Sequence, residues 1–493
     1  MTASTLRTSS APAEAGIRLG LVLAVCCLGQ FMNVLDASVV NVALPVIARD
    51  LGFAHTNLQW VNNAYTIAVC GFLLLGGRLA DLFGQRRIFL SGVGLFTLAS
   101  AVGGLAGSPV TLVLARAFQG LGAAVMAPAT LTVLGTTFTQ PAARARAFGF
   151  WSAVSGAAGA IGVLVGGVIT QWLSWRWILL VNVPLGLLLF AAVRWVVPET
   201  PGNRGRRGGL DVPGAVTVTL GLIATVYGVG GSHTHGWGSP QVIGALTAGG
   251  ALLGLFVFLQ AKVSPHPLVP LGIFRNRSVA AANLVAFFAI AALFSTFYFF
   301  TLILQQVLDY SPLRTGVSYL PMSLGLALGG WGVSSLVPRT GPRPVLLAGL
   351  SLGSAGLLWL SRADEHATFA GNLLGPALLI GFGMGAVLNA TTNAATAGLP
   401  PRQAGLASGL LNTTRQLGSA VGLVTLATLA ASRTATESGR GVPIGHALAS
   451  GYGLALYGAA IFGAAGLLAS LAFPVRRSSW PPQAGDGSLV ARR

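Results

Sequence analysis

One carboxylate, Asp36, lies in the middle of a long apolar stretch of the sequence. The chain has 11 acidic residues, and Asp36 is the one that falls well inside such a stretch. Holding a charged side chain inside a membrane costs about 2.5–3.5 kcal/mol on insertion scales, so such residues commonly have a function. We predict that the Asp36 carboxyl takes up and releases a proton; a purely structural role between helices is the alternative.

Arg116 lies inside another apolar stretch, at a depth similar to that of Asp36. Counting about 1.5 Å per residue, both lie about 10–13 Å from the outer ends of their predicted helices. Similar depth permits an ion pair between the two side chains. Burial disfavours a charged carboxylate and a nearby cation favours it, so the two effects oppose each other. We predict that Asp36 and Arg116 together form a proton-coupling site.

Polar side chains share one face of the predicted helix at 19–45, and apolar side chains occupy the opposite face. This division is typical of a helix that borders a wet cavity. A second polar stripe, around Arg415, lies in the predicted helix at 406–431. Arg415 is equally compatible with contacting a substrate and with hydrogen bonding to neighbouring carbonyls. The predicted lining of the substrate cavity is Gln30, Asn33, Asn41, Tyr65, Gln119, Asn412, Arg415 and Gln416.

A glycine-rich segment, GAAGAIGVLVGG (156–167), places Gly162 and Gly166 one helical turn apart, with Gly167 beside them. Small residues at this spacing let membrane helices approach closely. We predict that these three glycines form a helix-packing surface.

The sequence contains no GxxxxGK[ST] motif, so ATP is not the expected energy source. It also contains no Ser/His/Asp arrangement or metal-ligand cluster that stands out, and His233 and His235 are expected to be solvated loop residues. We therefore expect neither an enzyme nor a cofactor or metal site. A channel is disfavoured because no acidic ring is visible.

The composition identifies the elements that hold these residues. Hydrophobic residues make up 53% of the 493-residue chain, charged residues 8%, and the mean hydropathy is +0.74. A soluble domain has about 25% charged residues, so this chain is predicted to be an all-α polytopic membrane protein. The net charge of +18 comes from arginines scattered between apolar segments, which does not indicate nucleic-acid binding.

Fourteen segments are long and apolar enough to cross a membrane, which takes about 20 residues. They begin with 19–45, end with 448–473, and include 58–77, 147–170 and 315–337. With the N-terminus inside, 21 of the 29 Lys and Arg residues fall in inner segments, six in outer segments and two inside spans. Basic residues mark cytoplasmic loops, so both termini are predicted to be cytoplasmic.

The predicted organisation is two six-helix bundles with two helices inserted between them. The segment GRLADLFGQRR (77–87) is echoed by VPRTGPRP (337–344), as expected of transporter halves related by duplication. The expected parts are a cytoplasmic tail at 1–16, a bundle at 17–198, a linker and two inserted helices at 199–266, a second bundle at 267–475, and a cytoplasmic tail at 476–493.

Five segments carry family-specific motifs: LDASVVNVALP (35–45), GRLADLFGQRR (77–87), RAFQGLGAA (116–124), WRWILLVNVPLG (175–186) and GLASGLLNTTRQLG (405–418). Together they resemble the fourteen-helix drug:proton antiporter family of the major facilitator superfamily over most of the chain. The sequence departs from the family pattern at Val163, which follows Gly162 where a proline is usual, and at Leu82 and Gln85, which replace basic residues.

The resemblance implies two helical bundles that rock around a central cavity, with proton entry driving substrate exit. It assigns Asp36 as the titratable group and places an inner gate at Gly77, Asp81, Gly84, Arg86 and Arg87. The expected function is a proton-coupled antiporter that exports small organic molecules such as drugs, antibiotics or secondary metabolites by alternating access. The alternative is a transporter of the same superfamily for a dedicated metabolite such as an amino acid or sugar, including by proton symport.

The expected partners are a small-molecule substrate, protons and the lipid bilayer, with no nucleic acid and a monomer as the functional unit. We expect a multi-pass protein of a bacterial inner membrane. Because the interior offers one deep acid, neutral, anionic or monocationic substrates are expected rather than dications.

Overall fold

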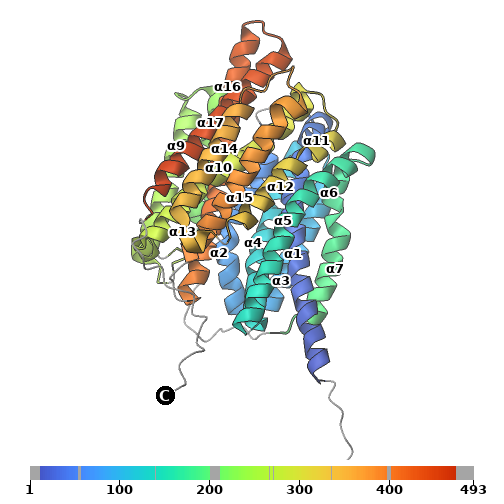
Figure 1. Cartoon of the computed structure of the whole chain (residues 1–493), viewed down its shortest axis with the longest axis vertical. Coiled ribbons are helices and arrows are strands. Elements are labelled where there is room, and N and C mark those ends of the chain that lie inside the picture. The colour runs from blue at the N-terminus through green and yellow to red at the C-terminus, as the bar shows by residue number, and fades with distance from the viewer. Residues whose placement is uncertain are drawn as a thin grey trace, which may run out of the picture.

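Apolar segments in a bilayer must satisfy their backbone hydrogen bonds internally, and a helix does so within a single segment. The computed structural model describes residues 11–53, 57–138, 140–199, 211–265, 267–269, 271–334, 336–396 and 401–473. Within these residues all the regular elements are helices, and most run roughly along the long axis of the molecule (Figure 1). The prediction of an all-α membrane protein is confirmed.

The helices overlap the predicted apolar segments, and several extend beyond them at one or both ends. In chain order they are α1 (Ala11–Leu51), α2 (Trp60–Phe83), α3 (Gln85–Gly104), α4 (Pro109–Thr137), α5 (Pro141–Trp172), α6 (Arg176–Leu180), α7 (Asn182–Val196), α8 (Val212–His235), α9 (Pro240–Phe258), η1 (Leu259–Val263), η2 (Leu271–Arg275), α10 (Arg277–Leu302), η3 (Ile303–Val307), α11 (Pro312–Ser318), α12 (Leu320–Gly332), α13 (Val337–Thr340), α14 (Pro342–Leu360), η4 (Phe369–Leu373), α15 (Leu374–Thr396), α16 (Pro401–Gly439) and α17 (Ile444–Ser470).

Eleven helical segments among the described residues are long and apolar enough to cross a membrane. The first helix differs from its predicted bounds at both ends. It begins at Ala11, inside the segment expected to be a tail, and continues through Pro45 to Leu51. Residues 200–210, at the start of the segment expected to hold the linker and the two inserted helices, lie outside the described residues. The expected C-terminal tail at 476–493 also lies outside them.

The chain packs as two groups of helices. In the first, α4 packs against both α2 and α3, and α1 packs against α5. In the second, α10 packs against α16 and α17, while α15 packs against α12 and α14. Helix α16 rises above its neighbours at the upper end of the molecule, and α17 runs back from that end (Figure 1).

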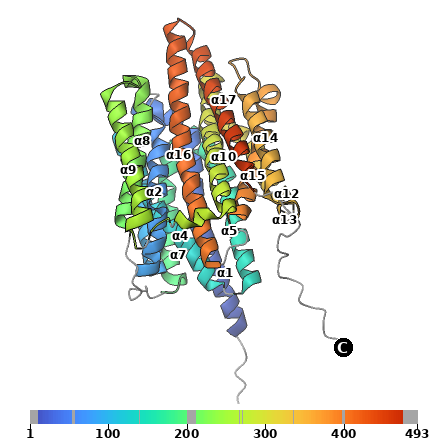
Figure 2. The ribbon, with the colours of Figure 1, turned by 90° about the vertical axis from the view of Figure 1, so that its left-hand side faces the viewer.

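Helices α8 and α9 lie side by side at one edge of the molecule (Figure 2). Helix α8 packs against α2 of the first group and α16 of the second. The Asp211 carboxylate caps α8, since Oδ1 accepts from the Gly214 amide at 3.0 Å and Oδ2 accepts from Gln260 Nε2 at 2.5 Å. Gln260 Oε1 accepts from the Val269 amide at 2.9 Å. These bonds tie the start of α8 to the end of α9 and to the segment that follows.

The two groups meet along α2 and α16 and, near the upper ends of their helices, at α5 and α11. Helix α5 packs against α11, where a Cβ on Gly167 would lie 2.7 Å from the Pro312 carbonyl oxygen. Gln305 Nε2 donates to the Val42 carbonyl at 2.8 Å, joining η3 to α1. Backbones at this distance leave no room for a passage between α5 and α11.

Candidate functional site

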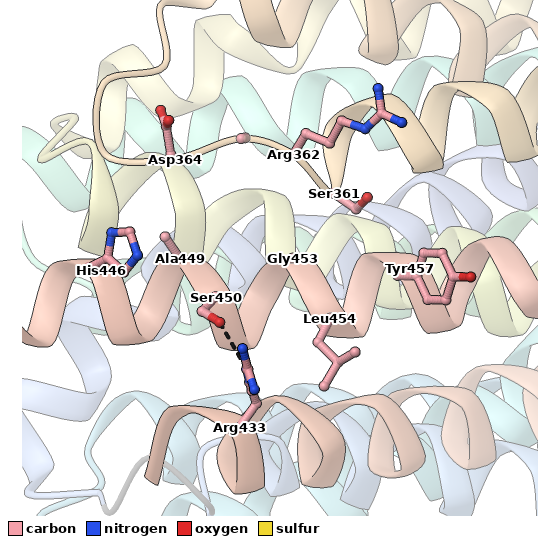
Figure 3. Close-up of a pocket in the computed structure, with 11 residues that line it drawn as sticks. Ser361, Arg362, Asp364, Arg433, His446, Ala449, Ser450, Gly453, Leu454 and Tyr457 are labelled. Atoms are coloured by element: carbon pink, nitrogen blue, oxygen red, sulfur yellow. Dashed lines mark hydrogen bonds between the residues drawn. The ribbon is translucent and has the colours of Figure 1, made fainter. Parts of the chain in front are cut away.

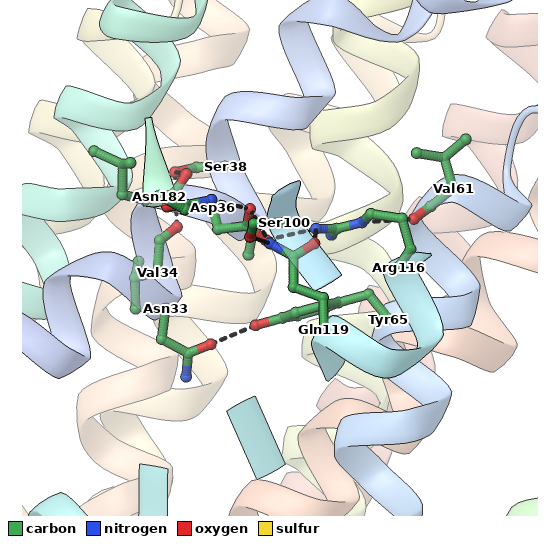
Figure 4. Close-up of polar contacts among 12 residues, drawn as sticks. Asn33, Val34, Asp36, Ser38, Val61, Tyr65, Ser100, Arg116, Gln119 and Asn182 are labelled. Carbon is green, nitrogen blue, oxygen red and sulfur yellow. Dashed lines mark hydrogen bonds and ion pairs between the residues drawn. The ribbon is translucent and has the colours of Figure 1, made fainter. Parts of the chain in front are cut away.

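Asp36 and Arg116 form a buried ion pair (Figure 4). Asp36 lies on α1 and Arg116 on α4, and the Arg116 Nη1 to Asp36 Oδ2 distance is 2.5 Å. The Asp36 side chain is 0% exposed and the Arg116 side chain is 1% exposed. Two desolvated charges persist in an interior when their geometry is close and further hydrogen bonds satisfy their remaining atoms. The structure therefore brings together the two residues that the sequence predicted as a proton-coupling site.

Three neutral side chains complete the surroundings of the Asp36 carboxylate. Its Oδ1 atom accepts from Gln119 Nε2 at 2.7 Å and from Asn182 Nδ2 at 2.8 Å. Gln119 Nε2 also donates to Ser100 Oγ at 2.6 Å. Sequence reasoning selected Gln119 but missed Asn182 and Ser100. The amide of Asn182 within an apolar helix was a usable signal, whereas a lone serine such as Ser100 gave none.

Arg116 is held by several contacts besides the ion pair. Its Nη1 donates to Gln119 Oε1 at 2.7 Å, and its Nε donates to the Val61 carbonyl at 3.1 Å. Its guanidinium carbon lies 4.4 Å from the centre of the Tyr65 ring, a distance at which the ring attracts a cation. The Tyr65 hydroxyl in turn donates to Asn33 Oδ1. The cation thus keeps partners on α2 and α4 when Asp36 is neutral.

This arrangement can couple a proton to helix packing. Asp36 links α1 to α4 through Arg116 and to α7 through Asn182. Adding a proton to the carboxylate removes the charge that holds Arg116 and weakens both links. Because Asp36 is 0% exposed, solvent reaches it only after the helices around it separate.

The residues predicted to line one cavity fall into separate places. Asn33, Tyr65 and Gln119 belong to the Asp36 cluster. Gln30 is buried on α1, and the amide of Asn41 accepts from Asn62 Nδ2 at 2.8 Å. In the second group Asn412 is exposed, and Arg415 and Gln416 are half-buried on α16. Within the described residues no hydrogen bond joins these three to the Asp36 cluster.

The predicted inner gate surrounds the turn between α2 and α3. Gly84 ends α2 and begins α3 with φ +96°, a conformation that residues with a Cβ rarely adopt. Arg86 donates to the Arg194 carbonyl, and Arg87 pairs with Glu199 at 3.0 Å. The latter pair is 67% and 56% exposed, so it contributes little stability. The side chain of Asp81 lies outside the described residues.

We expect Gly84→Ala to lower the stability of the protein by about 1–3 kcal/mol, because the turn holds a positive φ that alanine strongly disfavours. Thermal unfolding of the purified protein in detergent measures the change. Gly77→Ala is the matched control, since a Cβ there would lie 3.6 Å from the Pro128 Cβ, an ordinary contact. Equal unfolding temperatures for the two variants would show that the turn tolerates a side chain.

The glycines of α5 serve two different contacts. A Cβ on Gly162 would collide with Ser38 Oγ, and one on Gly166 would lie 2.8 Å from the Val39 carbonyl oxygen. These two glycines therefore allow α5 to pack closely against α1 within the first group. Gly167 instead approaches α11 across the seam between the groups, and a Cβ on Gly316 of α11 would lie 2.9 Å from the Val163 carbonyl oxygen.

A pocket of about 530 Å³ lies at the upper end of the second group, between α16, α17 and the segment after α14 (Figure 3). Arg433 in its wall donates from Nε to Ser450 Oγ at 3.0 Å and pairs with Glu437 at 2.8 Å. None of the residues that the sequence predicted for the substrate cavity lines this pocket.

Comparison with known proteins places the chain in a family. The family model of the Major Facilitator Superfamily matches residues 26–423. The cephamycin export protein of Amycolatopsis lactamdurans is 42% identical, with 95% of this chain and 96% of the relative covered. The puromycin resistance protein of Streptomyces alboniger is also 42% identical, with 84% and 82% covered. A tetracenomycin C resistance and export protein of Streptomyces glaucescens is 32% identical, with 82% and 74% covered.

Solved structures show the same fold. A peptide transporter of the POT family aligns with a TM-score of 0.67 at 15% identity, covering 94% of this chain and 99% of the other. A bacterial homologue of the lysosomal transporter Spinster, in an inward-facing conformation, aligns with a TM-score of 0.66 at 16% identity, covering 94% and 98%. The chain is a transporter rather than an enzyme. The family that its motifs predicted is confirmed, and the chain belongs to the major facilitator superfamily.

Proposed function

We propose that this protein exports small organic molecules such as antibiotics, and that an inward flow of protons drives the export. The names of the relatives support the substrate class, since they describe cephamycin export, puromycin resistance and tetracenomycin C export. Their organisms also support a place in a bacterial inner membrane.

The single observation that carries proton coupling is the buried Asp36–Arg116 pair. A secondary transporter needs a group that changes charge between the two faces of the membrane. Asp36 is the acid that lies deep within a span, and its side-chain partners come from two other helices, α4 and α7. Protonation from the outside releases those helices, and loss of the proton to the cytoplasm restores their packing.

The coupling follows an alternating-access cycle. With α5 packed against α11 the upper side is closed, and substrate enters from the other side. Separation of α5 from α11 opens the upper side, where substrate leaves and Asp36 receives a proton. The turn at Gly84, with Asp81, Arg86 and Arg87, acts as the gate at the lower side. A membrane potential of 100 mV contributes about 2.3 kcal/mol for each charge moved.

A test of this function uses purified protein in liposomes. An imposed pH gradient, acidic on the face that corresponds to the cell exterior, should drive substrate against its concentration gradient. Substrate accumulation that is the same with and without the pH gradient, or that requires added ATP, would exclude a proton antiporter.

We propose that the chain crosses the membrane fourteen times. Besides the eleven long apolar segments, α2, α5 and the α11–α12 pair cover the predicted spans 58–77, 147–170 and 315–337. The bundles at 17–198 and 267–475 then each have six spans, with α8 and α9 inserted between them. Both ends of the chain face the cytoplasm in this arrangement, and one copy of the chain suffices for function.

This orientation predicts the result of a reporter-fusion experiment. A phosphatase that is active only outside the cytoplasm should be active when fused after Ser232, at the end of α8, and inactive when fused near residue 205. A second reporter that is active only inside should give the opposite pattern at both sites. The reverse assignment at either site would contradict the fourteen-span model with both ends inside.

A further inference from the structure

Arg415 is a cation within the membrane-spanning part of α16, and its hydrogen-bond partners among the described residues are all neutral. Its Nη2 atom donates to the Leu388 carbonyl at 3.0 Å, to Thr391 Oγ1 at 3.2 Å and to Thr392 Oγ1 at 2.8 Å. All three acceptors belong to α15. Its Nε atom is buried and has no hydrogen-bond partner. The guanidinium is therefore anchored on one side, but its charge is not matched.

Among the residues that the structure describes, no carboxylate lies where it could pair with Arg415. The acids of the second group are Asp309, Asp364, Glu365 and Glu437, which lie near the upper ends of their helices or in the connections there. Glu437 is 22 residues further along α16, about 33 Å away at 1.5 Å per residue. Asp36 already pairs with Arg116. Among the described residues no ion pair to Arg415 is formed.

The exposed contact between Arg415 and Thr392 borders a polar surface. Asn412 on the same helix is exposed, as are Thr392 and Asn393 on α15, and Gln416 is half-buried. Exposed amides and hydroxyls at this depth face a water-filled space rather than lipid, because polar groups in contact with lipid tails are strongly disfavoured. A dissolved molecule can therefore reach the guanidinium.

We propose that Arg415 binds an anionic group of the transported molecule, specifically a carboxylate. The proposal rests on the export function and names the substrate class of that function. The planar fork of arginine matches the geometry of a carboxylate, and the three bonds to α15 all use Nη2, which leaves the Nη1 donors for a ligand. The sequence left neutral, anionic and monocationic substrates open, and the proposal narrows these to the anionic class because the charge of Asp36 is already balanced by Arg116.

An anionic substrate also fits the direction of transport. Export of one monoanion in exchange for one entering proton moves two positive charges inward. Export of a monocation in the same exchange moves none. A membrane potential that is negative inside therefore drives export of the anion and leaves export of the cation unaffected.

The test measures equilibrium binding to the purified full-length protein in detergent. Three fluorescent probes differ in one group: dansylglycine has a carboxylate, dansylglycinamide is neutral, and a dansyl quaternary amine is cationic. The wild type should bind dansylglycine about tenfold or more tightly than dansylglycinamide. Arg415→Gln should weaken dansylglycine binding by about tenfold or more and change the other two affinities by less than about threefold.

Arg362→Gln is the matched control, since Arg362 lies at the upper end of the second group in the segment after α14. It should leave all three affinities unchanged. A wild type that does not prefer the carboxylate would overturn the proposal. So would an Arg415→Gln variant that loses all three probes equally, because Arg415 would then only tie α16 to α15.

Two further experiments distinguish carboxylate binding at Arg415 from lipid binding there and from the separate proposal of proton coupling. Binding should be the same in nanodiscs of phosphatidylcholine with and without phosphatidylglycerol; loss of the carboxylate preference with the anionic lipid would assign Arg415 to a lipid phosphate instead. The Asp36→Asn variant should keep the carboxylate preference, because binding needs no proton gradient. If the wild type prefers the carboxylate probe but a pH gradient does not drive its transport, the proposal of proton coupling is wrong and the assignment of Arg415 stands.

Discussion

Replacing Asp36 by asparagine is expected to abolish proton-driven accumulation of substrate while leaving downhill movement measurable. The amide has nearly the same shape as the carboxyl but cannot bind and release a proton near neutral pH. Each charge moved across 100 mV supplies about 2.3 kcal/mol, equivalent to an accumulation of about 50-fold. The Asp36→Asn variant should lose this accumulation of about 50-fold and fall to a ratio of about one. The measurement is substrate-induced proton release from everted membrane vesicles, together with the steady-state accumulation ratio.

The variant leaves Arg116 buried without its counter-charge, and breaking a buried pair in this way costs about 3–5 kcal/mol. A second variant, Asp36→Asn with Arg116→Gln, removes the unmatched charge and keeps the test valid if the single variant unfolds. Asp36→Glu retains a carboxyl and should keep part of the coupling. If either variant lacking the carboxyl still accumulates substrate in response to a pH gradient, Asp36 is structural and another group carries the proton.

Placing a methyl group at Gly167 is expected to shift the protein toward a state that is open at the upper side. An alanine Cβ would lie 2.7 Å from the Pro312 carbonyl oxygen and 3.1 Å from the Leu313 Cα, so α5 and α11 must move apart. Overpacking of this kind costs about 1–3 kcal/mol, which changes the ratio of the two states by about 5- to 150-fold. Spin labels at Trp172→Cys and Val317→Cys, both exposed positions, measure the separation by double electron–electron resonance.

Gly159→Ala is the matched control for this experiment. It makes the same change on the same helix, but its Cβ would lie 3.9 Å from Val34 Cγ1, an ordinary contact. The control should keep the wild-type distance distribution between the labels. The labels are introduced after replacement of the native Cys26, Cys27 and Cys70. A Gly167→Ala distribution that matches the wild type would show that the α5–α11 seam does not select the state.

Eleven of the fourteen predicted spans coincide with long apolar helical segments among the described residues, because the lipid interior restricts which segments can cross it. A spanning segment must be apolar over about 20 residues and must form its backbone hydrogen bonds within itself. The composition of the segment is therefore enough to identify it. The segment predicted at 147–170 lies within the helix Pro141–Trp172, and that predicted at 448–473 largely coincides with Ile444–Ser470. The start of α1 was less predictable, because Glu14 and Arg18 interrupt the sequence between Ala11 and Leu19 and no continuous apolar run begins before Leu19.

Asp36 and Arg116 were also identifiable from sequence, since a charge in an apolar helix is conspicuous. Their partners were not all identifiable. Asn182 and Ser100 reach the Asp36 cluster from α7 and α3, and the pairing depends on how those helices are rotated against α1 and α4. Helix rotation is set by packing between helices, which sequence periodicity constrains only loosely.

The sequence by itself determined the class of protein, its apolar segments, its family and the identity of the buried charges, because each follows from residue type and linear spacing. The tertiary structure alone decided which surfaces those residues face. It placed Asp36 inside the first group instead of on an open cavity, set Gly167 against α11 while Gly166 faces α1, and left Arg415 with neutral partners. These outcomes depend on contacts between residues far apart in the chain, and one sequence does not encode such distances in any local pattern.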